Sequence, residues 1–360
     1  MNRHRGRLGI IAASAVLVQA TLSGSILAQD ATPAATPGAG VTVEQIAVVT
    51  PSARTNQGWD QQAADAVDSV AAAAGIEPVV AENGGYDDIT PILRDLAAGG
   101  AGLIICHASG YQTVCPEFAA ESGVPVAVIE NPGAVAPGLV ADIETQAQEV
   151  AYLAGVLAGN TTETGTVGVV VSGEPPTWNY MTVGFAEGLK AANADATMLY
   201  SVIGEAAYDD AAGAKRVTEQ QLAADADVIF GMGDGASFGM IQAIEEHNAA
   251  EGATKAWFID VIGDKKVEHG DVLLSSVLFD YTGIYTQMLD DLAAGTFGDI
   301  YTMDVQNGGV RLLDLPEDLA QETKDAVAEA EAAIVDGSLT VSAISDAEEM
   351  KAKVAELFPE

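Results

Sequence analysis

Residues 46–75 read IAVVTPSARTNQGWDQQAADAVDSVAAAAG, and this stretch decides the fold class. The first five residues form an apolar run typical of a buried strand, and a polar loop follows. From Trp59 to Ala74, apolar residues recur at the spacing of one helix face, and Gly75 ends the pattern. A strand joined to a helix of this length is one βα unit, so the chain is expected to fold as α/β with mostly parallel sheets.

The same unit recurs along the chain in two blocks of roughly a hundred residues each, which predicts two similar Rossmann-like lobes. The predicted strands are residues 46–50, 78–81, 102–106, 125–129, 166–171, 197–202, 227–230 and 256–260. The Pro/Gly-rich segment 130–138 lies between the blocks and is expected to carry the first crossing between lobes. An acidic helical tail, residues 317–358, follows.

These patterns divide the chain into a leader, a linker and two lobes. The predicted limits are a signal peptide at 1–28, a flexible linker at 29–42, a first lobe at 43–135 with 266–300, and a second lobe at 136–265 with 301–360. Each lobe is therefore expected to be discontinuous in sequence.

The first 28 residues resemble a secretory signal, with Arg3, Arg5 and Arg7 ahead of a short apolar segment. No cysteine ends this segment, so we expect cleavage near Ala28 and no lipid anchor; an uncleaved anchor is the alternative. Residues 29–42 are small and include prolines, which predicts a flexible tether. The protein is therefore expected at the periplasmic or extracellular face of the cell membrane.

The net charge is −37, from 15 Lys and Arg residues against 52 Asp and Glu residues. Such a field repels phosphate backbones, so nucleic acid is excluded as a partner, and anionic ligands are disfavoured. The two cysteines, Cys106 and Cys115, lie nine residues apart in a chain that is expected to be exported. A disulfide between them is possible, but the sequence does not decide it.

The loops that follow the strands carry aromatic rings and carboxylates. In open parallel sheets the loops at the carboxyl ends of the strands form the ligand crevice. The residues of interest are Trp59, Asp60, Tyr111, Trp178, Tyr180, Tyr208, Asp210, Asp234, Asp260 and Asp264. Rings provide stacking surfaces and carboxylates accept hydrogen bonds, so the cleft is expected to suit an uncharged ligand with hydroxyl or amide groups.

Five short motifs in a fixed order resemble one family. They are GWDQ at 58–61, GFAEG at 184–188, ADVIFG at 226–231, WFID at 257–260 and NGGV at 307–310. Over about residues 44 to 340 the chain resembles the basic membrane protein family, the PnrA-like substrate-binding proteins of bacterial ABC importers. The resemblance implies the periplasmic-binding-protein type I fold with three crossings between lobes. It further implies a purine nucleoside or similar ligand, an ABC permease as partner, a monomer, no cofactor and no catalysis.

The resemblance also implies roles for single residues. Trp59 stands where the family stacks an aromatic ring on the base, and Asp260 matches an aspartate that holds ribose hydroxyls. Phe279 stands where many relatives have a ribose-contacting lysine, which leaves the identity of the ligand open. The predicted ligand-binding residues are Asn56, Trp59, Asp60, Tyr111, Gln112, Trp178, Asp234, Asp260 and Phe279.

Other interpretations of these residues stay open at this point. Trp59 also fits the apolar stripe of its helix, and Asp210 fits a helix N-cap. A hydrolase would use Asp234 with Asp260, or Ser237 with His269, where residues 235–239 formally match G-x-S-x-G. A receptor partner that senses the same ligand is a third possibility. The histidines show no spacing typical of metal ligands.

Overall fold

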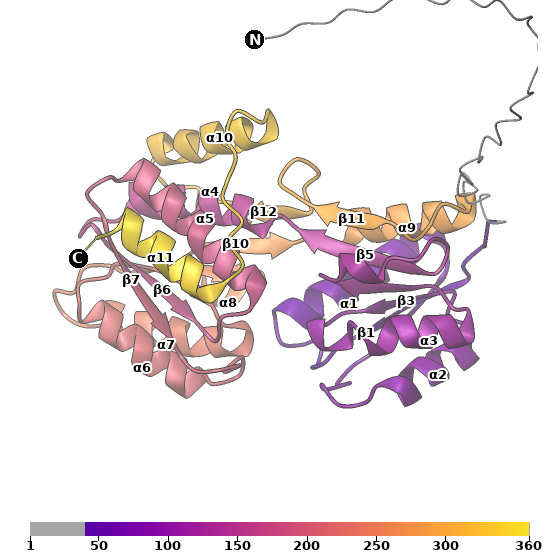
Figure 1. The fold of residues 1–360 in the computed structure, drawn as a ribbon. Helices are drawn as coiled ribbons and strands as arrows, with labels where there is room; N and C mark the ends of the chain where they lie inside the picture. Colours follow the sequence, from indigo (N-terminus) through magenta and orange to yellow (C-terminus); the bar gives the residue numbers. More distant parts are fainter. Residues whose placement is uncertain (1–39, 360) are drawn as a thin grey trace, which may run out of the picture. The chain divides into compact units, whose positions relative to one another are not determined.

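The structure is a computed structural model that describes residues 40–359 (Figure 1). The predicted signal peptide, its cleavage site and most of the predicted linker lie outside the described residues. All described residues fall within one compact unit.

The first sheet contains six parallel strands in the order β11-β5-β4-β3-β1-β2. They are β1 (Gln45–Val49), β2 (Glu77–Ala81), β3 (Leu103–Cys106), β4 (Val126–Ile129), β5 (Val140–Thr145) and β11 (Ile300–Met303). The apolar runs of β1, β3 and β4 are buried along their whole length, as is usual for parallel strands that are covered on both faces.

The second sheet also contains six strands, in the order β12-β10-β9-β8-β6-β7. They are β6 (Thr166–Val171), β7 (Thr197–Val202), β8 (Val228–Met232), β9 (Trp257–Val261), β10 (Leu273–Phe279) and β12 (Val310–Leu312). All pairs are parallel except β10 with β12. In each sheet the first strand along the chain, β1 or β6, lies inside the sheet. The second strand, β2 or β7, pairs with one side of it, and the third, β3 or β8, pairs with the other side. The strand order therefore reverses between β1 and β3 and between β6 and β8, and ligands of open α/β sheets bind at such points.

Helices cover both faces of each sheet (Figure 1). In the first lobe α1 and α9 pack on one face, and α2 and α3 on the other. In the second lobe α4 and α5 pack on one face, and α6 and α7 on the other. The helices are α1 (Trp59–Ala74), α2 (Thr90–Gly99), α3 (Val114–Ser122), α4 (Ala147–Thr161), α5 (Pro176–Ala192), α6 (Ala211–Leu222), α7 (Ser237–Asn248), α8 (Lys266–His269), α9 (Thr282–Ala294), α10 (Gln321–Val335) and α11 (Ala347–Leu357). Short 3₁₀ turns are η1 (Ser109–Tyr111), η2 (Pro132–Ala134) and η3 (Asp234–Ala236).

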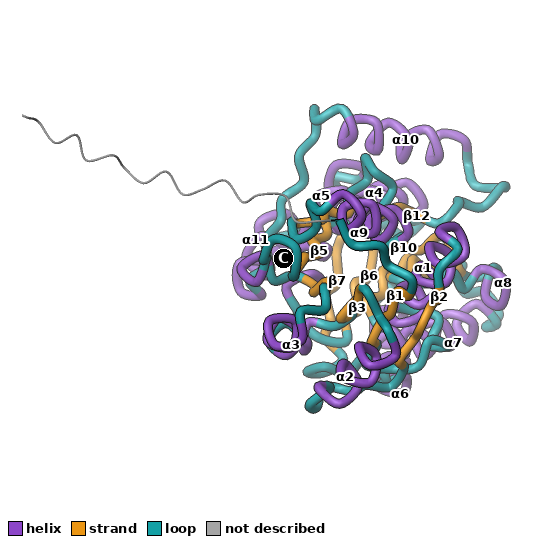
Figure 2. The backbone as a smooth tube through the Cα atoms, turned by 90° about the vertical axis from the view of Figure 1, so that its right-hand side faces the viewer, coloured by secondary structure: helices purple, strands orange, loops and turns teal. Residues whose placement is uncertain are grey.

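The acidic tail forms α10 and α11, which lie outside the two sheets. Figure 2 shows α10 passing over α4, and α11 packs against α5. Helices α4 and α5 approach each other closely because glycines face the partner backbone. A Cβ at Gly155 would clash with Phe185, and one at Gly188 would clash with Tyr152.

The observed sheets differ from the predicted lobe limits at three strands. β11 pairs with β5 in the first sheet, whereas residues 301–360, which include most of this strand, were expected in the second lobe. β5 pairs with β4 in the first sheet, whereas residues 136–265 were expected in the second lobe. β10 pairs with β9 in the second sheet, whereas residues 266–300 were expected in the first lobe. The Pro/Gly-rich segment 130–138 is a connection within the first sheet, because the strands on both sides of it, β4 and β5, belong to that sheet. The chain crosses after β5, after β10 and after β11, which gives the three crossings that the resemblance implied.

Among the described helices, none combines the length and the apolar character that a membrane crossing requires.

Candidate functional site

A cavity of about 180 Å³ lies where the two lobes meet. The first lobe lines it from the segments that follow β1, β2, β3 and β4, and the second lobe from those that follow β6, β7, β8, β9 and β10. It therefore lies at the strand-order reversal of both sheets at once, which is where the topology predicts a ligand. The lining residues are Pro51, Ser52, Asn56, Trp59, Asp60, Tyr86, Ala108, Ser109, Ile129, Glu130, Pro175, Pro176, Thr177, Trp178, Tyr208, Asp209, Asp234, Ile262 and Phe279.

Six of the nine predicted ligand-binding residues line this cavity. They are Asn56, Trp59, Asp60, Trp178, Asp234 and Phe279. The other three, Tyr111, Gln112 and Asp260, are directed into the protein by hydrogen bonds to other groups. The cavity also includes Tyr86, Glu130 and Asp209, which the sequence analysis did not select.

Trp59 is held in place by His107, which lies on the loop that follows β3. The two rings stack with centroids 4.4 Å apart, and Trp59 Nε1 donates to the His107 carbonyl at 3.3 Å. His107 Nε2 lies 3.1 Å from the Trp59 carbonyl, which can only accept, so Nε2 carries the proton. Burial lowers the pKa of His107 to about 3, and this ring is therefore neutral. Trp59 thus packs against the core and also lines the cavity, while its role in stacking on a ligand stays a prediction.

Two further rings fix the edges of the indole. Phe279 and Tyr281 meet Trp59 edge to face, with centroids 5.8 and 6.0 Å away. Across the cavity, Trp178 and Tyr208 form a similar pair at 5.4 Å. Because each wall has its own aromatic pair, a flat ligand can contact rings from both lobes.

Asp60 and Asp234 are two of the four carboxylates that line the cavity. Asp60 is buried and accepts hydrogen bonds from the Ser52 amide at 3.2 Å and from Asn56 Nδ2 at 2.7 Å. Burial raises the pKa of Asp60, although these two bonds oppose the rise. Asp234 Oδ1 is buried and has no hydrogen-bond partner among the described residues. Burial, and then the charge of Asp60, raises the pKa of Asp234 to about 7.

Asp260 has quite different surroundings. Its side chain is fully buried, Oδ2 lies 2.5 Å from Lys265 Nζ, and Oδ1 accepts from Ser237 Oγ at 2.8 Å. Burial raises the pKa of Asp260, while Lys265 and Ser237 act in the opposite direction. Lys265 also donates to the Gln57 carbonyl at 2.8 Å and so links the two lobes beside the cavity. Sequence reasoning missed Lys265, because nothing in its spacing from Asp260 marks an ion pair.

Tyr111 and Gln112 support the loops around the cavity. The Tyr111 hydroxyl donates to the Gly85 carbonyl at 2.7 Å, and the ring is fully buried. Gln112 Nε2 donates to the carbonyls of Ile129 and Glu130 at 2.8 and 2.9 Å. Both side chains therefore hold neighbouring loops together.

Glu130 makes a second link between the lobes. Its Oε1 accepts hydrogen bonds from the Thr177 hydroxyl and, at 3.0 Å, from the Tyr180 hydroxyl, both on α5. The position of Glu130, directly after the strand β4, was a signal that could have identified it. Direct polar contacts thus lie on two sides of the cavity, at Glu130 and at Lys265.

Cys106 and Cys115 form a disulfide with their Cα atoms 6.6 Å apart. The bond joins the end of β3 to α3, between positions nine apart in sequence. Ala108 and Ser109, which line the cavity, lie between these two positions. The disulfide therefore fixes one part of the cavity wall.

The residues of a hydrolase are not brought together among the described residues. Ser237 Oγ donates to Asp260, whereas His269 Nδ1 lies 2.9 Å from Glu245. Of the alternative carboxylate pair, Asp260 is already bound to Lys265. Asp210 has the expected N-cap role, since it accepts from the Gly213 amide at 2.8 Å. No cluster of three or more potential metal ligands is present in residues 40–359.

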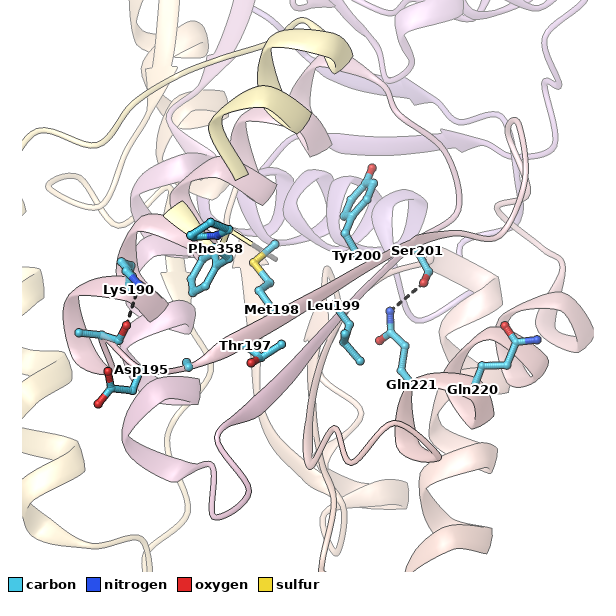
Figure 3. Close-up of a pocket in the computed structure, with 13 residues that line it drawn as sticks. Lys190, Asp195, Thr197, Met198, Leu199, Tyr200, Ser201, Gln220, Gln221 and Phe358 are labelled. Carbon is cyan, nitrogen blue, oxygen red and sulfur yellow. Dashed lines mark hydrogen bonds between the residues drawn. The ribbon is translucent and has the colours of Figure 1, made fainter. Parts of the chain in front are cut away.

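A wider cavity of about 660 Å³ runs along β7, the edge strand of the second sheet (Figure 3). Lys190 and Phe358 lie at one end, and Gln221, which donates to Ser201 Oγ at 3.0 Å, lies at the other. All of its lining residues come from the second lobe, away from the strand-order reversal. The cavity between the lobes is therefore the better candidate for the site.

Comparisons with known proteins agree with this geometry. Residues 43–345 match the family described as ABC transporter substrate-binding protein PnrA-like. The ABC transporter nucleoside-binding protein BmpA of Lactococcus lactis subsp. cremoris (strain MG1363) is 30% identical over 206 residues. That match spans 54% of this chain and 57% of the relative, so only a little over half of the relative's length is covered.

Solved structures show the same fold. A solute-binding protein of an ABC transporter system from Aeropyrum pernix K1 superposes with a TM-score of 0.73 and 21% identity, over 88% of this chain and 100% of that one. One from Conexibacter woesei DSM 14684 gives a TM-score of 0.71 and 19% identity, over 84% of this chain and 99% of that one. The expected periplasmic-binding-protein type I fold is confirmed.

Proposed function

The chain belongs to the family of PnrA-like substrate-binding proteins of ABC transporters, and we propose that it captures a nucleoside-like solute outside the cytoplasm and presents it to an ABC permease. The observation that carries this proposal is the aromatic cavity at the strand-order reversal of both lobes. The described residues do not bring catalytic groups together there, so binding accounts for the site better than turnover does.

In this proposal the six cavity-lining residues named above contact the ligand directly. Trp59 offers the ring face opposite His107 to a flat base, and Trp178 and Phe279 complete the aromatic walls. Asp60 accepts hydrogen bonds from sugar hydroxyls, and the Asn56 amide can donate or accept them. Tyr111, Gln112 and Asp260 act indirectly, by holding the loops that carry these groups.

Capture requires that the lobes move. We propose that each sheet moves with its helices as one lobe about the three crossings, and that ligand favours the closed arrangement. The contacts of Glu130 with α5 and of Lys265 with Gln57 would form as the cavity closes. The permease would then recognise the closed monomer.

A thermal-shift screen of nucleosides, N-methylated nucleosides, free bases and sugars tests the proposal. A ligand at about 100 times its Kd adds about 2.7 kcal/mol to the stability of the folded protein. We expect nucleosides to raise Tm more than their separate bases or sugars do, and chromatography to recover them intact. Failure of every member to raise Tm would contradict the proposal, and recovery of base plus sugar would instead identify a hydrolase.

A further inference from the structure

The cavity between the lobes has an unusual balance of charge. Four carboxylates line it, namely Asp60, Glu130, Asp209 and Asp234, whereas its lining in the described structure includes no lysine, arginine or histidine. The remaining walls are largely aromatic, so a bound ligand would face rings and negative charge.

The nearby cations are bound to other groups. Lys265 is fully buried and binds Asp260 and the Gln57 carbonyl. Arg54 on β1's exit loop binds Asp65 at 2.9 Å and Asp68 at 2.6 Å, on α1. Neither lines the cavity. The donors to Asp60 and Glu130 are amides and hydroxyls, which leave the negative charge uncompensated.

Asp234 is the clearest sign of a missing partner. Its Oδ1 is buried and makes no hydrogen bond within the described residues, and the Trp59 backbone amide and Lys265 offset only part of the rise in the pKa of this carboxyl. Buried carboxylates in proteins are normally paired or hydrogen-bonded, because removing a charge from water is costly. A ligand that fills this cavity would therefore be expected to supply the donor or the charge itself.

We propose that the ligand is a cation, a nucleoside-like molecule whose flat ring carries a positive charge between the aromatic walls and Asp60 and Asp234. The inference rests on the proposed function and narrows it, in place of the uncharged ligand that the sequence suggested. Positive charge is attracted to the faces of tryptophan and tyrosine rings as well as to carboxylates. A neutral ligand would leave the four carboxylates of the cavity without a salt bridge to the described residues when the lobes close.

Two pairs of probe ligands test this proposal. The members of each pair have nearly the same shape but differ in the charge of the ring. In the first pair, nicotinamide riboside has a cationic ring and its dihydro form a neutral one. In the second pair, 1-methyladenosine is cationic and adenosine neutral. By calorimetry with the full chain at pH 8 and low salt, we expect the charged member of each pair to bind at least tenfold more tightly. This preference should shrink as salt is added.

Asp234→Asn tests the residue. The variant should reduce the preference for the charged member by about fivefold or more, because it removes the negative charge while nearly keeping the size of the side chain. Asp271→Asn removes the same charge from an exposed position outside the cavity and serves as the matched control. If Asp234→Asn behaves like this control, the assignment of Asp234 is wrong.

The outcomes separate the two proposals. Equal or tighter binding of the neutral members would overturn the cationic ligand and leave a nucleoside-binding protein. If none of the four probes binds, both the cationic ligand and the nucleoside class are wrong.

Discussion

Asp234 follows strand β8, and Asp260 lies near the end of the neighbouring strand β9. The two side chains have different hydrogen-bond partners and different exposure to the cavity. Asp260 is fully buried and bound by Lys265 and Ser237. Asp234 lines the cavity, and its buried Oδ1 has no donor among the described residues. The contrast shows that a carboxylate at a strand end is not by itself a ligand-binding group. What distinguishes the two is that Lys265 binds Asp260 directly, whereas it acts on Asp234 without a salt bridge.

The two carboxylates should also affect stability in opposite ways. An ion pair inside the protein becomes costly when one partner is removed, because the other charge is left buried alone. Asp234 has no salt bridge to the described residues in the ligand-free protein and therefore already has part of this cost. Binding sites often reduce stability in this way, and ligand restores it.

The largest effect is expected for Lys265→Met. This change leaves Asp260 buried without its cation and should lower the free energy of unfolding by about 3–5 kcal/mol, measured by urea denaturation. The double variant Lys265→Met/Asp260→Asn should recover part of this loss, because it removes the isolated charge. A loss below about 1 kcal/mol in the single variant would mean that the pair does not hold the lobe together.

A smaller effect is expected for Trp59→Ala, measured on ligand affinity. Loss of one stacked ring is worth about 1–3 kcal/mol, so the Kd of the nucleoside identified by the screen should rise about tenfold or more. Since Trp59 also packs against His107, Phe279 and Tyr281, Tm should fall as well. Trp257→Ala is the matched control, because Trp257 lies outside the cavity lining. An equal loss of affinity in both variants would show that general destabilisation is the cause.

The smallest effect is expected for Asp234→Asn on the stability of the ligand-free protein. A folded-state pKa of about 7, raised from 3.8, means that the native state holds this proton more tightly than the unfolded state does. The stabilisation from Asp234 is therefore complete below about pH 4 and is lost as pH rises through 7. At pH 8 the asparagine variant should be the more stable protein, with a higher Tm, because it lacks the ionised carboxylate.

The pH profile provides the control for this prediction. The groups facing Asp234 include Asp60, Asp260 and Lys265, and burial also raises the pKa of Asp60 and of Glu144, the latter to about 7. Both proteins should therefore gain stability as pH falls from 8 to 5, but the variant should gain less. Parallel Tm profiles would show that Asp234 does not titrate in this range.

Local sequence patterns predicted much of the fold, but not the sheet to which each strand belongs. The buried runs of β1, β3, β6 and β8 are continuous and apolar, and they were recognised directly. β11 is four residues long, and it pairs with β5, which lies more than 150 residues earlier. Such pairing depends on contacts distant in sequence, which no local pattern contains.

The candidate site could be predicted in part for a similar reason. Rings and carboxylates in the strand-end loops marked the cavity, since topology brings those loops together. Whether Gln112 or Asp260 faces the cavity depends on partners elsewhere in the fold, namely the Ile129 carbonyl and Lys265. Lys265 most changes the interpretation of the site, because it binds Asp260 and so removes this residue from the predicted ligand contacts. The residues around Lys265 in the sequence do not indicate this ion pair.

The disulfide that encloses Ala108 and Ser109 makes the shape of this cavity dependent on where the chain matures. In an oxidising compartment the cross-link restrains the loop beneath Trp59 before any solute arrives, so less ordering is left for the binding step. A chain made in a reducing cytosol would lack this restraint. We would expect it to form the same two sheets, with a more mobile loop beside the cavity.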